Sequence, residues 1–281
     1  MPDAAAVRPI FVLGAPRSGT TLVGSYLSSA AEICDLGEYA GFFFVHHVAD
    51  REYARVPAPH KGEYLEELRE HALDFATRVA RRHGCSCFCD STPWNLLIAG
   101  TLVARLPDAL FVLTVRDVRG VSQSLERSRA QGYLWAGDTL EERALLWRRF
   151  YSHVGSLDPD RTVVVDYDEL CAEPPAVLDE LARDLSRHGI TFSLDAGALC
   201  ESHANPAGAG RPTVGVRLGD GSVSLRSIPS YDAAAWPADA DAVVADAVRD
   251  AADAVSVLRA AAEARRTSQA KLDSTLTRTD R

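Results

Sequence analysis

Runs of consecutive apolar residues, each followed by a polar turn and then a stretch with helical periodicity, recur along the chain. Consecutive hydrophobic positions are typical of parallel strands that are covered on both faces. Three runs fit this description, at residues 10–13, 110–115 and 162–165. We expect each of them to be a buried strand that leads into a helix.

Helical patterns fill most of the intervals between these runs. This alternation predicts an α/β fold, a single domain over residues 1–266 in which helices flank a doubly wound parallel sheet. Residues 204–237 are rich in glycine and proline and predict a long loop region, and the polar tail at 267–281 predicts disorder. The predicted helices cover residues 20–29, 64–82, 96–105, 117–129, 140–153, 176–186 and 238–264, with a linker at 166–175.

The composition narrows the range of partners. The chain has 281 residues, of which 47% are hydrophobic, and this is enough for a large core. Its formal net charge is −9 and it has no basic run, so we expect neither a nucleic acid nor a membrane as partner. The first apolar run is too short for an export signal, and six cysteines are too few for a disulfide framework; both favour the cytoplasm.

The first predicted strand leads into a glycine-bearing turn and a helix, an arrangement that aims backbone N–H groups at one spot. Residues 14–21 read Gly-Ala-Pro-Arg-Ser-Gly-Thr-Thr and lack the lysine that nucleoside triphosphate loops place after their second glycine. A monophosphate end therefore fits better than a triphosphate. Arg17 adds a planar cation that can hold a phosphate or sulfate through two donors. The alternative is a structural turn with a solvent-facing arginine.

This segment resembles the 5′-phosphosulfate loop of the sulfotransferases that use 3′-phosphoadenosine 5′-phosphosulfate (PAPS), especially their bacterial and tyrosylprotein branch. The resemblance extends from about residue 9 to residue 186. It implies a P-loop-like fold, PAPS as the donor, 3′-phosphoadenosine 5′-phosphate (PAP) as the product and no metal. The donor-binding residues that it implies in the loop are Ala15, Pro16, Arg17, Ser18, Gly19, Thr20 and Thr21.

A second family element is an arginine followed eight positions later by a serine, after a buried central strand. Arg116 and Ser124 match it, and the resemblance implies that both bind the 3′-phosphate. Arg116 follows the predicted strand 110–115, and ligands of open α/β sheets bind at the carboxyl ends of strands. By itself, such a pair would more often be a surface ion pair.

The resemblance also points to a general base. In tyrosylprotein sulfotransferases a glutamate follows the loop helix, and Glu38, after a short second strand, falls at the corresponding place. A carboxylate there can take the proton of an acceptor hydroxyl as its bond to sulfur forms. Glu38 could instead support the N-terminus of a helix at 39–48. His46 and His47, within that helix, compete for the role of base because histidine titrates near neutral pH.

One family segment departs from its usual pattern. Residues 90–93 read Asp-Ser-Thr-Pro, where the family has an acidic residue, lysine, threonine and proline, so Ser91 replaces a lysine that helps to stabilise the leaving oxygen. The cation must then come from Arg17 or another arginine, with Ser91 as a possible hydrogen-bond donor. The segment could also be a turn that opens a helix with Pro93 at its first position.

Four further patterns have weaker implications. Residues 166–170, Asp-Tyr-Asp-Glu-Leu, resemble the family's Tyr-Glu-Asp-Leu segment and receive no catalytic role. Adenine could stack on Trp94 or Trp147, although buried tryptophan is more often core. Arg211 and Arg226 could close over the 3′-phosphate. The alternate cysteines Cys85, Cys87 and Cys89 share one face of a strand and lack a second ligand pair, so we interpret them as buried thiols rather than metal ligands.

The sequence therefore predicts a PAPS-dependent sulfotransferase. Two alternatives remain open, a phosphoryl transferase on a similar fold and a non-catalytic nucleotide-binding protein. Residues 50–63 and the aromatic stretch 133–135 could line the acceptor pocket. The acceptor is expected to be a small molecule, such as a secondary metabolite, and nothing in the sequence indicates an oligomeric state.

Overall fold

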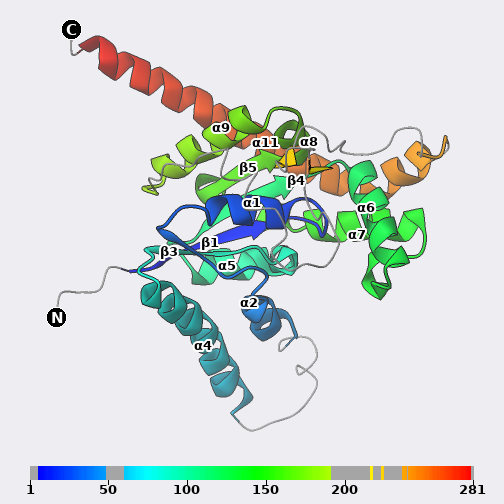
Figure 1. Cartoon of the computed structure of the whole chain (residues 1–281), viewed down its shortest axis with the longest axis horizontal. Helices are drawn as coiled ribbons and strands as arrows, with labels where there is room; N and C mark the ends of the chain where they lie inside the picture. Colours follow the sequence, from blue (N-terminus) through cyan, green and yellow to red (C-terminus); the bar gives the residue numbers. More distant parts are fainter. Residues whose placement is uncertain are drawn as a thin grey trace.

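The fold is a five-stranded parallel sheet with helices on both faces (Figure 1). The structure, a computed structural model, describes residues 6–48, 60–190, 216–217, 223–224, 236–238 and 240–279. The strands lie in the order β2-β3-β1-β4-β5. They are β1 (Arg8–Leu13), β2 (Ile33–Asp35), β3 (Cys87–Asp90), β4 (Leu110–Val115) and β5 (Thr162–Asp166). The predicted fold class is confirmed.

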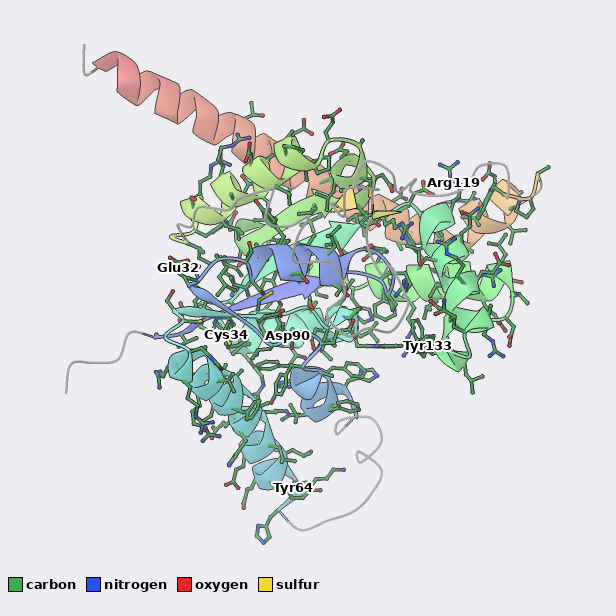
Figure 2. The ribbon with its side chains drawn as sticks, viewed as in Figure 1. Glu32, Cys34, Tyr64, Asp90, Arg119 and Tyr133 are labelled. Carbon is green, nitrogen blue, oxygen red and sulfur yellow. The ribbon has the colours of Figure 1, made fainter. Side chains whose placement is uncertain are left out.

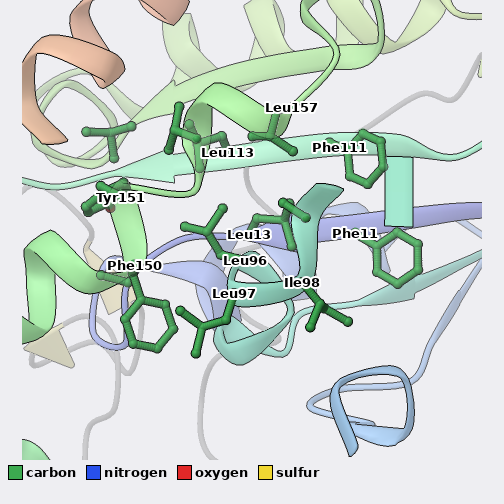
Figure 3. Packing of buried hydrophobic residues seen from close by; sticks show 14 of the residues in the cluster. Phe11, Leu13, Leu96, Leu97, Ile98, Phe111, Leu113, Phe150, Tyr151 and Leu157 are labelled. Atoms are coloured by element: carbon green, nitrogen blue, oxygen red, sulfur yellow. The ribbon is translucent and has the colours of Figure 1, made fainter. Parts of the chain in front are cut away.

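Side chains of the central strands alternate between two hydrophobic cores. In β1, Ile10 and Val12 point into the core under α1 (Thr20–Leu27), α8 (Tyr167–Ala172) and α9 (Pro174–Arg187). Phe11 and Leu13 point into the opposite core (Figure 3). The helices and helical turns of that second layer include α4 (Lys61–Arg82), η2 (Pro93–Ile98), α5 (Ala99–Arg105), α6 (Val118–Ala130), α7 (Leu140–Tyr151) and α11 (Ala240–Thr279).

The cysteine motif lies at the start of β3. Cys87 and Cys89 are buried in the core with α1, while Phe88 between them faces the other core. The expectation that alternate cysteines share one face is confirmed for these two. Cys85 precedes the strand and is partly exposed.

Several predicted elements differ from the observed ones. The linker at 166–175 contains α8, because the Asp166 carboxylate caps the N–H groups of Asp168 and Glu169. The helix predicted at 39–48 is divided into α2 (Gly41–Phe43) and a π-helical turn, η1 (Phe44–Val48). The predicted loop at 204–237 contains a pair of short antiparallel strands, β6 (Val216–Arg217) and β7 (Val223–Ser224).

The C-terminal helix is longer than its pattern indicates. It continues to Thr279, through most of the segment predicted to be a disordered tail. Among the α11 side chains that the structure describes, those buried in the core end at Leu258. Figure 1 shows α4 and the end of α11 extending away from the sheet at different corners. Among the described residues, none of the helices is long and apolar enough to cross a membrane.

Candidate functional site

Each of the five strands delivers one or more polar side chains to the same edge of the sheet. Parallel strands have their carboxyl ends at one edge, which is where ligands of such sheets bind. Arg17 follows β1 and Arg116 follows β4. Glu38, Ser91 and Tyr167 follow β2, β3 and β5.

The loop after β1 is held in shape by hydroxyl groups. The side chain of Ser18 is fully buried and lies 2.9 Å from Thr114 Oγ1, which donates in turn to the Leu13 carbonyl at 3.0 Å. A Cβ on Gly14 would come within 2.3 Å of the Ser18 oxygen. Of the predicted loop ligands, Ser18 therefore uses its hydroxyl to fix the loop to β4.

The loop ends at Gly19, which is the N-cap of α1. Its φ of 99° lies in the region that favours glycine, and a Cβ there would meet the Tyr167 ring at 2.3 Å. The first N–H groups of a helix have no intrahelical acceptor, and no side chain caps α1. The backbone at Thr20 and Thr21 is thus arranged to bind an anion.

Arg116 joins this loop to the following helix. Its side chain is 5% exposed, its Nη1 donates to the Arg17 carbonyl at 2.9 Å, and its guanidinium lies 4.4 Å from the centre of the Tyr167 ring. The Nε of Arg17 donates to Ser124 Oγ at 3.1 Å. The residues predicted for the two ends of the donor, Arg17 on one side and Arg116 with Ser124 on the other, therefore converge.

The arginine side chains of this cluster are positively charged. Burial lowers the pKa of Arg116, while the neighbouring Tyr167 and Asp168 oppose the shift. An arginine starts from so high a pKa that it remains a cation. Two guanidinium groups beside the N-terminus of a helix make this edge selective for anions.

Glu38 lies next to the anion site. Burial raises the pKa of its carboxyl, as does the charge of Asp90, while the charge of Arg17 and a hydrogen bond from Thr21 lower it. A raised carboxyl pKa is typical of groups that exchange protons during catalysis. The other interpretation, an acid that supports a helix N-terminus, is weakened because α2 is only three residues long.

The hydroxyl of Ser91, the residue that stands where the family has a lysine, bonds within the protein. Ser91 is 2% exposed, and its hydroxyl donates to the Gly37 carbonyl at 3.2 Å. A Cβ on Gly24, in α1, would lie 2.7 Å from the Cβ of Ser91. Position 91 is thus packed between α1 and the loop that carries Glu38. Pro93 does open the helical turn η2, as the alternative interpretation expected.

The other predicted residues have different surroundings. Trp147 is buried and donates to the Arg116 carbonyl at 3.0 Å, so it belongs to the core rather than to an adenine pocket. His46 is buried in η1, and the His47 ring stacks on Phe43 at 4.7 Å. Arg211, Arg226 and most of the predicted acceptor segment 50–63 lie outside the described residues.

A row of aromatic rings leads away from the Glu38 loop, and we call it the aromatic row. Ring centres are 5.8 Å apart between Phe43 and Trp94, 6.0 Å between Trp94 and Trp135, and 6.0 Å between Trp135 and Tyr133. Trp135 is 41% exposed and Leu134 is 76% exposed. Figure 2 shows Tyr133 on the side of α6 and α7. Within the part of the chain that the structure describes, no cluster of His, Cys, Asp and Glu could hold a metal ion.

Sequence reasoning missed the roles of Thr114 and Tyr167. Thr114 is the one polar residue in the predicted strand 110–115, and a buried hydroxyl in an apolar strand signals a hydrogen-bond partner. Tyr167 lay within a family segment to which no role was given. Its position directly after β5 could have indicated a place in the site, because ligands of such sheets bind at the carboxyl ends of strands.

The sequence model of the sulfotransferase family matches residues 9–188. This chain belongs to the sulfotransferase family. The match covers every strand of the parallel sheet except the first residue of β1, and it includes the arginine and serine cluster described above.

Two curated relatives are similar over part of their length. A protein of Aquifex aeolicus (strain VF5) without an assigned function is 25% identical over an alignment of 197 residues that covers 62% of this chain and 25% of that protein. A putative protein-tyrosine sulfotransferase of Caenorhabditis briggsae is 28% identical over 119 residues, 41% of this chain and 42% of that protein. The chain thus spans less than half the length of either relative.

Solved structures of sulfotransferases are similar at low identity. The sulfotransferase domain from the curacin biosynthetic pathway is 18% identical, with a TM-score of 0.47 and coverage of 80% of this chain and 84% of that one. A sulfotransferase from Mycobacterium tuberculosis H37Rv is also 18% identical, with a TM-score of 0.48 and coverage of 72% and 73%.

Proposed function

We propose that this sulfotransferase uses PAPS as its donor and transfers the sulfuryl group to a hydroxyl or amine of a small-molecule acceptor. The observation that carries the proposal is the convergence of Arg17, Arg116 and Ser124 beside the N-terminus of α1. PAPS has one anionic group at each end of its ribose. A site with two cations, a hydroxyl and the open amides of a helix matches that pattern better than it matches a triphosphate with magnesium.

Each group has a distinct task in the proposed reaction. Arg116 and Ser124 hold the 3′-phosphate, and the loop from Ala15 to Thr21 holds the 5′-phosphosulfate. Bound PAPS supplies a sulfuryl group on a phosphate leaving group. Arg17, inside the loop, offsets the negative charge that develops on the bridging oxygen as the sulfur–oxygen bond breaks.

Glu38 acts on the acceptor. Its carboxylate accepts the proton of the acceptor hydroxyl while that oxygen forms its bond to sulfur, and PAP departs with the electron pair of the broken bond. The raised pKa of Glu38 brings its proton affinity closer to that of the group it deprotonates. The aromatic row, five residues beyond Glu38 at Phe43, provides an apolar surface for a small acceptor such as a secondary metabolite. We place the reaction in the cytoplasm.

Calorimetry of PAP and of ATP with magnesium tests the donor. The wild-type protein should bind PAP with a Kd of about 1 μM and bind AMP at least about tenfold more weakly, because AMP lacks the 3′-phosphate. Arg116→Ala should lose about 100-fold in PAP affinity, since a buried charge-assisted contact disappears. Arg81→Ala, an exposed arginine near the end of α4, is the control and should bind like wild type. Equal binding of ATP and indifference to the 3′-phosphate would replace the proposal with a kinase.

A further inference from the structure

The loop that carries Glu38 is fastened to the segment after β3 by a series of hydrogen bonds. The N–H of Leu36 donates to the Cys89 carbonyl at 2.9 Å, and the N–H of Ser91 donates to the Gly37 carbonyl at 2.9 Å. The β2–β3 pairing ends at Asp35 opposite Cys89. These two bonds therefore extend the parallel pairing beyond the last residues of both strands.

Side chains replace the backbone ladder after that point. The Ser91 hydroxyl donates a second hydrogen bond to the Gly37 carbonyl at 3.2 Å, and Thr92 Oγ1 accepts from the Ala40 N–H at 2.9 Å. The backbone of Tyr39, between them, is hydrogen-bonded to the Asp90 carboxylate. Glu38 thus lies between anchored neighbours on each side.

Asp90 is the fixed point of this arrangement. It is fully buried, and its carboxylate accepts from the Thr92 N–H at 2.9 Å and from Asn95 Nδ2 at 3.0 Å, in addition to the Thr92 hydroxyl and Tyr39. A buried carboxylate with that many donors cannot rotate without breaking several bonds. Asp90 is the last residue of β3, and Figure 2 shows it near the centre of the molecule.

Backbone geometry shows that these bonds hold an unusual conformation. Gly37 has a φ of 58° and Ala40 a φ of 57°. Alanine in the left-handed region costs about 1–2 kcal/mol, and it persists only where the surroundings determine it. The bond from the Ala40 N–H to Thr92 is one such determinant.

We infer that Asp90, Ser91 and Thr92 are positioning residues for the general base, and that they orient the Glu38 carboxylate toward the acceptor by fastening the loop on both sides of it. The inference rests on the proposed role of Glu38. Position 91 has a lysine in the resembling family segment, whereas here a serine binds the Gly37 carbonyl and packs against Gly24. A loop fastened in this way restricts Glu38 without contacting it.

The decisive variant is Thr92→Val, which keeps the shape of the side chain and removes the acceptor for Ala40. The Glu38 carboxyl can be followed by carbon-13 NMR on glutamate-labelled protein, with Glu38→Gln to assign its signal. The charged or hydrogen-bonding groups that act on Glu38 are Arg17, Asp90 and Thr21. Arg17 and Thr21 keep their side chains and neighbours in this variant, whereas Asp90 loses the hydrogen bond from the Thr92 hydroxyl and keeps those from the Thr92 N–H, Asn95 and Tyr39. The Asp90 carboxyl is therefore followed in the same way on aspartate-labelled protein, and a shift of the Glu38 titration that exceeds the shift of Asp90 reports the position of the Glu38 loop.

We expect Thr92→Val to move the pKa of Glu38 back toward its ordinary value of 4.5, because the carboxyl of this partly exposed residue loses the neighbours that desolvate it when the loop is released. Turnover of PAPS, measured as PAP released with water as the acceptor, should fall about 10- to 100-fold. PAP affinity by calorimetry should stay within about twofold, since the donor contacts are untouched. Thr92→Ser should restore the wild-type titration.

The matched control is Thr162→Val. Thr162 is also a buried threonine, its hydroxyl also bonds the backbone, and it begins β5 at the opposite edge of the sheet. The Thr162→Val variant should lower the free energy of unfolding without changing the pKa of Glu38. A folded Thr92→Val protein with an unchanged Glu38 titration would overturn the inference. Failure of wild-type protein to bind PAP would instead overturn the proposed donor, which the calorimetry shows separately.

Discussion

Arg17 Nε and Ser124 Oγ are 3.1 Å apart, although they are expected to bind opposite ends of the donor. In the structure described here, the arginine of the phosphate loop therefore satisfies the hydroxyl that is assigned to the 3′-phosphate. A bound donor supplies both groups with phosphate or sulfate oxygens, which are stronger partners for a guanidinium than a neutral hydroxyl is.

Removing the Arg17 side chain should impair turnover more than binding. We expect PAP affinity to fall about tenfold, because a charge-assisted hydrogen bond is lost. PAPS turnover should fall by about 100-fold or more, because charge on the bridging oxygen is then less well balanced. Calorimetry and PAP release measure the two effects.

The backbone at Arg17 needs its own control. Its φ of 73° is unfavourable for alanine but suits glycine. Arg17→Gly and Arg17→Ala should therefore lose activity by similar factors if the guanidinium is what matters. A nearly active Arg17→Gly protein would show that the loss in Arg17→Ala came from backbone strain.

Gly19→Ala should destabilise the protein by at least about 2 kcal/mol in the free energy of unfolding. Its φ of 99° disfavours any Cβ, and the added atom would lie 2.3 Å from the Tyr167 ring. Urea unfolding measures the effect. Gly62→Ala in α4 is the matched control, since a Cβ there meets nothing within 4 Å, and it should stabilise the protein by roughly 0.5 kcal/mol. Similar urea midpoints for the two variants would contradict the tight approach of Tyr167.

Glu38 should make the stability of the protein depend on pH. Its pKa is raised in the folded state above the ordinary value of 4.5, so the folded protein binds this proton more tightly than the unfolded chain does. The associated stability is present below the unfolded pKa and is lost as the pH rises through the folded pKa. Relative to wild type, Glu38→Gln should be more stable at about pH 7 and no more stable at about pH 4.

The same variant should lose catalysis while it gains stability. A glutamine cannot accept the acceptor's proton, so turnover should fall by at least about 100-fold. Unfolding at the two pH values and a rate-against-pH profile check both outcomes. A Glu38→Gln protein with wild-type turnover would assign the base to another group.

The sheet was predictable from sequence because three of its strands are almost entirely apolar runs. The site was predictable in part because glycine and arginine occur in a fixed order after the first of these, and Arg116 follows the second. The anchoring of Glu38 was not predictable. It depends on which backbone groups Ser91 and Thr92 reach across the chain, and residue spacing gives no information about such contacts.

The missed elements have similar causes. The short helix α8 begins where Asp166 caps two N–H groups, but an aspartate after a strand equally predicts a turn. An apolar run such as Phe42-Phe43-Phe44 does not indicate that residues 39–48 are divided into α2 and η1. Hydrophobic pattern predicts burial there and cannot distinguish helix types.

The position of β1 in the middle of the sheet has a consequence for synthesis of the chain. Ile10 pairs with Cys89 on one side and with Leu110 on the other, so the first strand emerges from the ribosome long before either neighbour exists. An apolar strand with two unpaired edges is prone to aggregate until its neighbouring strands have been synthesised. The loop after β1, which we propose binds the donor, can acquire its shape only after β4 has been made, because Thr114 fastens it. Folding of this protein should therefore be slow, and it should benefit from chaperones that shield β1 until β3 and β4 have been made.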